Sequence, residues 1–418
     1  MIAGLDIGSS HIIAMVGDLD AQGKLNVLGV GKSDSIGIVK GEIKNITKAK
    51  DSILKAISIA EKNSNKCITG VVVGISGNYI DSIHRTHHII RNDGDSLIND
   101  YDLKLLKDQV YNVHPKNVSY IIGIIPQEYR IDNEEGVLDP IGAPCSKLEA
   151  DFKVITADKK PYDMLVRCIK ETGLNLIEVV FAPIFSSSVV LSEKEKKDGV
   201  VFVDMGGGIT NFLLFNGDVR DIAIVPFGGK VITSDIKKRF NLTEEVAENL
   251  KITEGSVDFF LEKKESFLSV KMQRGPDRSI SKRNLSKTIY SRIREIFEIA
   301  MSYGVFNENY NIVFVGGGAN TEGVRNIVKE VTGLYCSIGG YREFLSKSND
   351  ISLVTCVGLT LEAIKLCSST DCEKVKEIDE KKLHIKNKKN YRNNYDGIVE
   401  KINKWFNYLV GGYENSKY

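Results

Sequence analysis

The sequence predicts an α/β protein that contains two related lobes. The stretch AGLDIGSSHIIAMVGD (3–18) is echoed by VFVDMGGGITNFLLFNGD (201–218): each has an apolar strand, an Asp-x-Gly with two small residues, and a second apolar strand. Apolar strand-like runs alternate with amphipathic helical spacing around both copies, which is typical of α/β domains. The 418 residues, 42% hydrophobic and 27% charged, are enough for about two or three folded domains.

The elements of the first lobe can be placed in order along the chain. Strands are expected at 2–8, 11–18 and 25–32, followed by a helix near 46–62 and a strand at 70–75. The second lobe should begin near 199 with the repeated hairpin, whose turn carries Asn216-Gly217. Later in this lobe one helix presents an apolar face made of Leu285, Ile289, Ile293, Ile296, Phe297 and Ala300.

Composition excludes several classes of protein. The formal net charge of +1 gives no global field that attracts nucleic acid, and no apolar run reaches the roughly 20 residues that span a bilayer. The seven cysteines form no CxxC pair and indicate a reducing cytoplasm, and the N-terminus lacks the pattern of a signal peptide. His84, His87 and His88 are expected on a strand edge, where no carboxylate or thiolate at ligand spacing favours a metal.

The repeated hairpins carry groups that suit phosphate and magnesium. At an offset of 198 residues Asp6 corresponds to Asp204 and Gly8 to Gly206. Small residues let successive backbone N–H groups approach an anion, and Mg²⁺ prefers oxygen ligands while keeping several waters. Either hairpin alone is equally consistent with a structural turn. Two related hairpins half a chain apart instead predict a site that closes on a triphosphate from both sides.

Two further elements extend this site. NIVFVGGGANTEGV (311–324) is a buried strand, a triple glycine and the start of a helix, an arrangement that exposes bare backbone to a flat purine. It matches neither a Walker A loop nor GxGxxG. Glu248 and Lys251, in AENLKITEG, stand one helical turn apart and are either nucleoside contacts or an ordinary solvated helix face.

The order of DIGSS, DMGGG and VGGGANTEG resembles the phosphate-1, phosphate-2 and adenosine motifs of the actin, sugar-kinase and heat-shock-chaperone ATPase superfamily. Within it VVVGISGNYI (71–80), IIPQEYRIDNEEGVLDPIG (124–142), KLEADFKVIT (147–156) and PFGGKVITSDI (226–236) resemble the FtsA family of bacterial cell-division proteins. The resemblance covers residue 1 to about 370 and implies ATP and Mg²⁺. The residues implied for the phosphates are Gly8, Ser9, Ser10, His11, Gly206, Gly207, Gly208, Thr210, Gly228 and Gly229; for the nucleoside, Glu248, Lys251, Gly316, Gly317, Gly318 and Asn320; for the metal, Asp6 and Asp204.

The resemblance also implies an actin-like two-lobed fold of duplicated ribonuclease-H-like units, with an inserted 1C subdomain and a C-terminal amphipathic helix on a flexible linker. The expected division is 1A at 1–82 and 162–197, 1C at 83–161, 2A at 198–235 and 303–352, 2B at 236–302, a return helix to 1A at 353–370, a linker at 371–396 and the tail helix at 397–412. In this family 2B contacts the tubulin-like protein FtsZ, and 1C is expected to meet later division proteins. Nucleic acid is not expected at the basic segment of 2B, because it lacks interleaved aromatic residues.

Catalysis is left open by the sequence. Related ATPases place a Glu before a Pro-x-x-A segment to position the attacking water, and here Ala182 stands at that point in FAPIFSSSVVL (181–191). Without this carboxylate, general-base assistance of roughly 100- to 10,000-fold is missing, so hydrolysis should be slow. The alternatives are an actin-like ATPase of the pilus-assembly or plasmid-segregation type and, less favoured, a sugar kinase.

The tail combines a basic linker with a short amphipathic helix. KKLHIKNKKNYR (381–392) has six Lys/Arg and no acidic residue, and Gly411-Gly412 ends the helix. The helix is too short to cross a bilayer, so its apolar face lies either in a membrane interface or on the protein itself or a sister chain. The resemblance implies a peripheral protein on the cytoplasmic side of the inner membrane at the division site, which polymerises with itself. The membrane-binding residues would be Ile398, Val399, Ile402, Trp405, Phe406 and Leu409.

Overall fold

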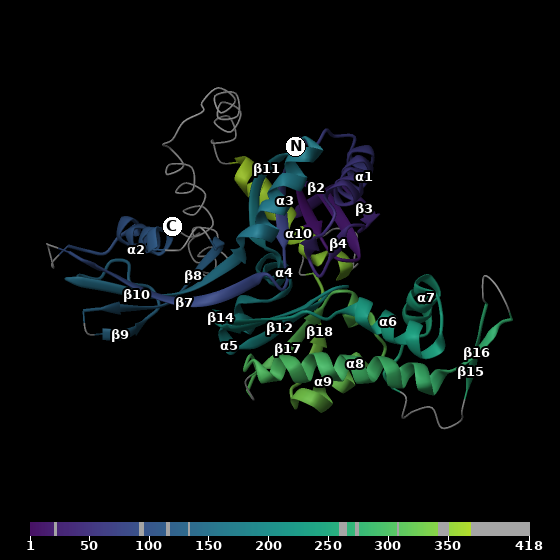
Figure 1. The fold of residues 1–418 in the computed structure, drawn as a ribbon. Helices are drawn as coiled ribbons and strands as arrows, with labels where there is room; N and C mark the ends of the chain where they lie inside the picture. The colour runs from purple at the N-terminus through teal and green to yellow at the C-terminus, as the bar shows by residue number, and fades with distance from the viewer. Residues whose placement is uncertain are drawn as a thin grey trace.

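The computed structural model describes residues 1–20, 23–91, 96–113, 118–132, 134–258, 266–271, 276–306, 309–341 and 351–368. Two five-stranded sheets form two lobes, and a four-stranded sheet extends to one side (Figure 1). The predicted linker (371–396) and tail helix (397–412), including Trp405, lie outside the described residues. Within the described part of the chain, no helix is long and apolar enough to cross a membrane.

The first sheet has the strand order β11-β6-β1-β2-β3. Strand β1 pairs antiparallel with β2 and parallel with β6, which in turn pairs parallel with β11, so β1, β6 and β11 end at the same edge. Helices α1 and α3 cover one face, and α10 with α4 covers the other. The bounds are β1 (Ile2–Ile7), β2 (His11–Leu19), β3 (Leu25–Asp34), β6 (Gly70–Ile75), β11 (Asn175–Phe181), α1 (Ile46–Ser64), α3 (Lys159–Thr172), α4 (Ala182–Val190) and α10 (Val354–Ser368).

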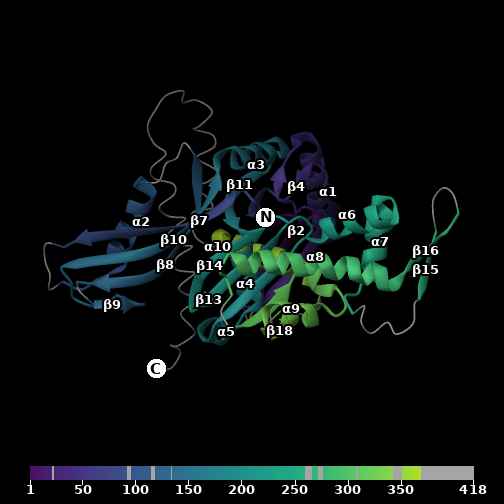
Figure 2. The same ribbon diagram turned by 60° about the horizontal axis from the view of Figure 1, so that its bottom comes forward.

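The second sheet repeats this pattern with the order β14-β13-β12-β17-β18. Strand β12 pairs antiparallel with β13 and parallel with β17, as β1 does with β2 and β6, so the duplication inferred from the two motifs is confirmed in the backbone. The long helix α8 (Lys282–Ser302) runs along this lobe (Figure 2), and the apolar face predicted for it is buried. The strands are β12 (Val200–Met205), β13 (Thr210–Asn216), β14 (Asp218–Val225), β17 (Asn311–Val315) and β18 (Cys336–Ile338).

Shorter elements complete the two lobes. A two-residue hairpin in the first lobe joins β4 (Ile38–Val39) to β5 (Glu42–Ile43). The others are α5 (Glu193–Asp198), α6 (Gly229–Phe240), α7 (Glu244–Glu254), β15 (Phe267–Val270), β16 (Arg278–Ser281), α8 (Lys282–Ser302), the 3₁₀ turn η1 (Gly317–Asn320), α9 (Val324–Thr332) and the 3₁₀ turn η2 (Ile351–Leu353).

The third sheet belongs to an insertion with its own apolar core. Its order is β7-β10-β8-β9, and helix α2 packs on it. The three histidines lie on the edge strand β7, as expected, with His84 and His88 exposed and His87 half-buried. The bounds are β7 (Ile80–Ile90), α2 (Asp100–Val113), β8 (Ser119–Ile131), β9 (Glu134–Val137) and β10 (Lys147–Asp158).

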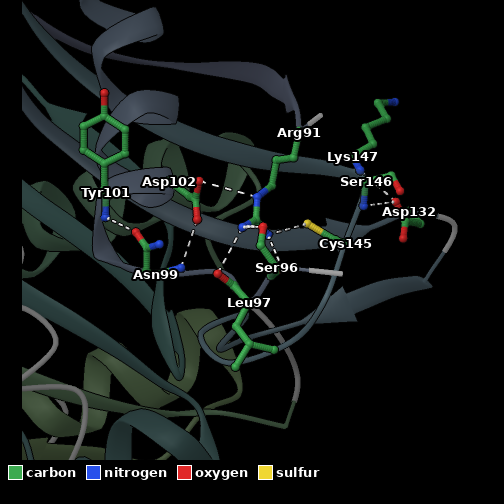
Figure 3. A network of polar contacts seen from close by, with 10 residues as sticks. All are labelled: Arg91, Ser96, Leu97, Asn99, Tyr101, Asp102, Asp132, Cys145, Ser146 and Lys147. Carbon is green, nitrogen blue, oxygen red and sulfur yellow. Dashed lines mark hydrogen bonds and ion pairs between the residues drawn. The ribbon is translucent and has the colours of Figure 1, made fainter. Parts of the chain in front are cut away.

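Arg91 organises the far end of this insertion (Figure 3). Its guanidinium donates hydrogen bonds to the backbone oxygens of Ser96 at 2.8 Å and Leu97 at 3.0 Å, and lies 3.7 Å from Asp102. Asp102 in turn accepts a hydrogen bond from the N–H of Asn99 at 3.0 Å. A buried guanidinium thus fixes the entry into α2, a role that needs the charged, multidentate head of arginine.

The insertion also contacts the second lobe, at the start of β14. Gln127 Nε2 donates to the carbonyl of Val219 at 2.9 Å, and Arg220 Nη1 donates to the carbonyl of Gln127 at 2.7 Å. Lys153, only 2% exposed, places Nζ 2.8 Å from Asp221 Oδ1. These polar contacts hold the insertion against an edge strand that would otherwise expose unpaired backbone groups.

Candidate functional site

The two glycine–serine hairpin tips meet in space. A Cβ added at Gly207 would lie 2.0 Å from Ser10 Oγ, and one added at Gly208 would lie 2.4 Å from Ser9 Oγ. These residues are the tips of β1–β2 and β12–β13, which stand almost 200 residues apart in the sequence. Gly207 and Gly208 therefore have no room for a side chain, and the structure brings together both halves of the predicted phosphate site.

Two half-buried carboxyl groups, Asp6 on β1 and Asp204 on β12, lie beside these tips. Burial and the neighbouring Asp204 raise the pKa of Asp6 to about 7, and burial raises the pKa of Asp204 to about 6. Two carboxyl groups that repel each other in a buried place favour either a proton or a cation. Within the described residues, no group of three or more His, Cys, Asp or Glu side chains is placed to hold a metal ion.

The triple glycine packs on the end of β12. A Cβ at Gly316 would lie 2.5 Å from Asp204 Oδ1, and one at Gly318 would lie 2.1 Å from the sulfur of Met205. Gly316 also has a left-handed φ of 84°, which glycine adopts without strain. Gly317 faces open space, and Asn320 is exposed at the end of η1. The strand–glycine–turn element thus adjoins the second hairpin tip.

The loop before α6 is joined to the same tip through its backbone. The N–H of Gly229 donates to the carbonyl of Gly206 at 2.9 Å, and a Cβ at Gly228 would lie 2.4 Å from that carbonyl oxygen. Thr210 is fully buried, and its hydroxyl donates to the carbonyl of Phe227 at 2.8 Å. The contacts of these three residues therefore fix the backbone of the second hairpin tip.

Glu248 and Lys251, whose role the sequence left open, are tied to this loop. Lys251 Nζ lies 2.7 Å from Glu248 Oε2, 2.9 Å from Thr233 Oγ1 and 3.1 Å from the carbonyl of Gly229. Burial raises the pKa of Glu248, but hydrogen bonds from Lys251 and Thr233, with the charges of Lys251 and Lys230, outweigh it and leave this pKa below its usual value. An ionised Glu248 thus lies close to the glycine loop.

His11 begins β2 at the tip of the first hairpin and pairs with Asp34 on β3. Its side chain is 45% exposed and its Nδ1 lies 3.7 Å from Asp34 Oδ1. Burial and the charge of Lys32 lower its pKa, against the opposing charges of Asp34 and Glu248. His11 is therefore mainly neutral at pH 7.

Sequence patterns did not reveal that the β4–β5 turn belongs to the candidate site. The N–H of Gly41 donates to Ser9 Oγ at 2.9 Å, and Tyr79 Oη donates to the carbonyl of Gly41 at 3.2 Å. Ser76 Oγ, at the end of β6, donates to Asn211 Oδ1 of the second lobe at 2.5 Å. The local signal for the turn is Gly41 between two short strand-forming segments; Lys40 weakens this signal, since two-residue hairpins favour Asn, Asp or Gly at that position.

Ala182, the residue that the sequence places where a water-positioning Glu was expected, is apolar and buried. Ala182 begins α4 directly after β11, 6% exposed. Strand β11 ends at the same edge of the first sheet as β1. Ala182, which follows β11, is therefore at the edge that also carries the tip of the β1–β2 hairpin.

Comparison with known proteins identifies the family. The chain is 32% identical over 357 residues to cell division protein FtsA of Borreliella burgdorferi, covering 82% of this chain and 86% of that protein. The chain belongs to the FtsA family. FtsA of Pseudomonas aeruginosa is 31% identical over 339 residues, covering 79% of this chain and 81% of that one. The family models described as "Cell division protein FtsA" and "SHS2 domain inserted in FTSA" match residues 201–358 and 77–156.

The fold is the actin-like fold expected of an FtsA protein. Among solved structures, the PilM–PilN type IV pilus biogenesis complex contains a chain that superposes with a TM-score of 0.56 at 14% identity, covering 87% of this chain and 98% of that chain. At this identity the likeness concerns the fold alone. The insertion of β7 to β10 is the SHS2 domain of the FtsA family.

Proposed function

We propose that this FtsA protein binds ATP with Mg²⁺ between its two lobes and uses it for assembly. The observation that carries this proposal is the meeting of the tips at Ser9–Ser10 and Gly207–Gly208 beside Asp6 and Asp204. Side-chain-free tips present backbone N–H groups to phosphate oxygens, as anion nests do. The glycine element at 316–318 and the pair Glu248–Lys251 would flank the nucleoside.

The chemistry of the residues present fits magnesium. Asp6 and Asp204 offer carboxylate oxygens, which Mg²⁺ prefers, and a cation would offset the burial that raises both pKa values. The remaining ligands would be water and phosphate oxygens. When bound, the ion would neutralise part of the phosphate charge. We expect turnover to be slow, because Ala182 supplies no carboxylate to orient water.

The wider role that we propose is that of a membrane-tethered adaptor. Segments 1A and 2A would form the nucleotide-binding body, the segment 236–302 would contact FtsZ, and the insertion would contact later division proteins. A tail helix at 397–412 would lie in the inner face of the cytoplasmic membrane, and polymerisation would present many such helices at the division site. Support comes from family membership together with the basic, amphipathic pattern of the tail.

Gly208→Ala tests the nucleotide site. The new Cβ would lie 2.7 Å from Ser9 Cβ and 3.1 Å from Lys40 Cα, so the tips must separate. We expect the unaltered protein to bind Mg-ATP in titration calorimetry, and the variant to bind it at least about tenfold more weakly. Gly340→Ala is the matched control, because a Cβ at Gly340 meets nothing within 4 Å. Equal ATP affinity in both variants would contradict a site between the tips.

A further inference from the structure

The β4–β5 turn places a lysine where turn chemistry favours another residue. Lys40 and Gly41 occupy its two central positions, with φ angles of 51° and 77°. Such a turn needs positive φ at both positions and favours Asn, Asp or Gly at the first, because other side chains are strained there. The turn itself thus gives no reason for a lysine, and strained residues of this kind cluster at functional sites.

The turn is wedged between the two hairpin tips. Gly41 donates to Ser9 Oγ at 2.9 Å, and a Cβ at Gly41 would lie only 1.8 Å from the carbonyl oxygen of Ser76. On the other side, a Cβ at Gly208 would lie 3.1 Å from Lys40 Cα. The backbone of Lys40 is therefore fixed against both tips.

The ammonium group of Lys40 lies over an aromatic ring at the same place. Its Nζ is 5.1 Å from the ring centroid of Phe227, which directly precedes Gly228 and Gly229. Aromatic faces attract cations, so the ring holds the ammonium near the glycine loop. Arg292 lies over the same ring at 5.9 Å.

The charge of Lys40 differs from its neighbours in having no carboxylate beside it. Arg292 Nε is 2.7 Å from Asp235, and Lys44, which follows the turn, is 2.6 Å from Glu42. For Lys40, no carboxylate oxygen of the described residues lies within 4.0 Å of Nζ. The half-buried ammonium group of Lys40, held beside two tips that can accept an anion, would be stabilised by an anion that does not belong to the chain.

We propose that Lys40 is a further phosphate-binding residue, whose ammonium contacts the polyphosphate of the bound nucleotide from the first lobe. This inference rests on the proposed nucleotide site and adds to it a charged contact that none of the three glycine motifs supplies. Because the contact is to phosphate, its contribution grows with the number of phosphates and is absent for adenosine. It also links the first lobe to a ligand held by the second.

Three variants separate charge from turn geometry. Lys40→Asn removes the charge but keeps a residue that tolerates positive φ, Lys40→Arg keeps the charge, and Lys44→Asn removes a neighbouring lysine outside the turn. Calorimetric titrations of the full chain with ATP, adenosine and inorganic tripolyphosphate, each with Mg²⁺, give the affinities. Thermal unfolding without ligand checks that Lys40→Asn leaves the fold intact.

We expect Lys40→Asn to weaken ATP and tripolyphosphate binding about tenfold or more while changing adenosine binding less than about twofold. Lys40→Arg should restore most of the affinity, and Lys44→Asn should leave it unchanged. Unchanged ATP affinity in Lys40→Asn, or an equal loss for adenosine, would overturn the inference. If the unaltered chain bound tripolyphosphate through Lys40 but not ATP, the proposed nucleotide function would fail and the phosphate contact would stand.

Discussion

Glu362 is a buried carboxyl group outside the proposed nucleotide site. It is 0% exposed on α10, and neither of its oxygens has a hydrogen-bond partner in the described part of the chain. Burial raises its pKa to about 7, against the charge of Lys365. Burial and Glu362 together also raise the pKa of Glu178 on β11, and burial lowers the pKa of Lys365 to about 8. Between about pH 4.5 and about pH 7, Glu362 is therefore protonated in the folded protein but ionised in the unfolded chain.

This arrangement predicts a pH dependence of stability. The folded state binds the Glu362 proton more tightly than the unfolded state, so the free energy of unfolding should fall as pH rises from about 4.5 to about 7. The loss should approach about 3 kcal/mol at most. Lys365 adds its own slope only above pH 8. In urea titrations Glu362→Gln should show a flatter profile over this range, whereas Glu134→Gln, at an exposed carboxyl group, should follow the unaltered protein. Parallel profiles for both variants would contradict the assignment.

At the scale of elements, the ion pair between the insertion and β14 predicts that removing Asp221 and removing Lys153 destabilise the protein to different degrees. Lys153 is 2% exposed, whereas its partner Asp221 is 39% exposed. Asp221→Ala leaves a buried ammonium without its carboxylate and should cost about 2–3 kcal/mol, but Lys153→Met leaves a carboxylate that water can reach and should cost about 1 kcal/mol or less. Urea denaturation of the two variants measures the difference. An equal cost, or a larger one for Lys153→Met, would contradict this account.

Helices and strands whose apolar residues recur at a regular spacing were predictable from the sequence, but contacts between elements far apart in the chain were not. The apolar faces of α1 and α8 follow the helical repeat, and the tips of β1–β2 and β12–β13 follow from duplicated glycine-rich segments. In contrast, the hydrogen bond between Gln127 and Val219 joins residues 92 positions apart, and nothing in either local pattern specifies it. Lys40 was missed for the same reason, since its importance comes from Phe227 and Gly208.

For the candidate site too, the repeated segments could be predicted from the sequence, whereas a tertiary contact could not. Residues 6–10 and 204–208 repeat each other in type and order, so their pairing could be inferred from the sequence. For the pair Glu248–Lys251, helical spacing alone favoured a solvated helix face, and only the family resemblance implied a contact with the nucleoside. Its contact with the carbonyl of Gly229 is a tertiary property.

At the scale of the whole molecule, the tail predicts how nucleotide and membrane are coupled. A single short helix binds a membrane weakly, and a basic linker adds about 1 kcal/mol per Lys or Arg near an anionic surface. A polymer that presents many tails binds far more tightly through avidity, without any new contact. Membrane binding should therefore need both the tail and conditions that favour assembly.

Co-sedimentation with anionic liposomes, ATP and FtsZ tests this coupling. Deleting residues 397–418, or changing Trp405→Glu in the apolar face of the predicted helix, should abolish pelleting of the protein and of FtsZ with liposomes. ATP binding should stay unchanged, because the proposed nucleotide site lies in the lobes. Asn407→Glu is the matched control, because it adds the same charge to the polar face of the predicted helix, away from the apolar residues, and should pellet normally. Undiminished pelleting of the deleted protein would show that the tail is not the membrane anchor. Loss of ATP binding in Trp405→Glu would likewise contradict the separation of anchor and nucleotide site.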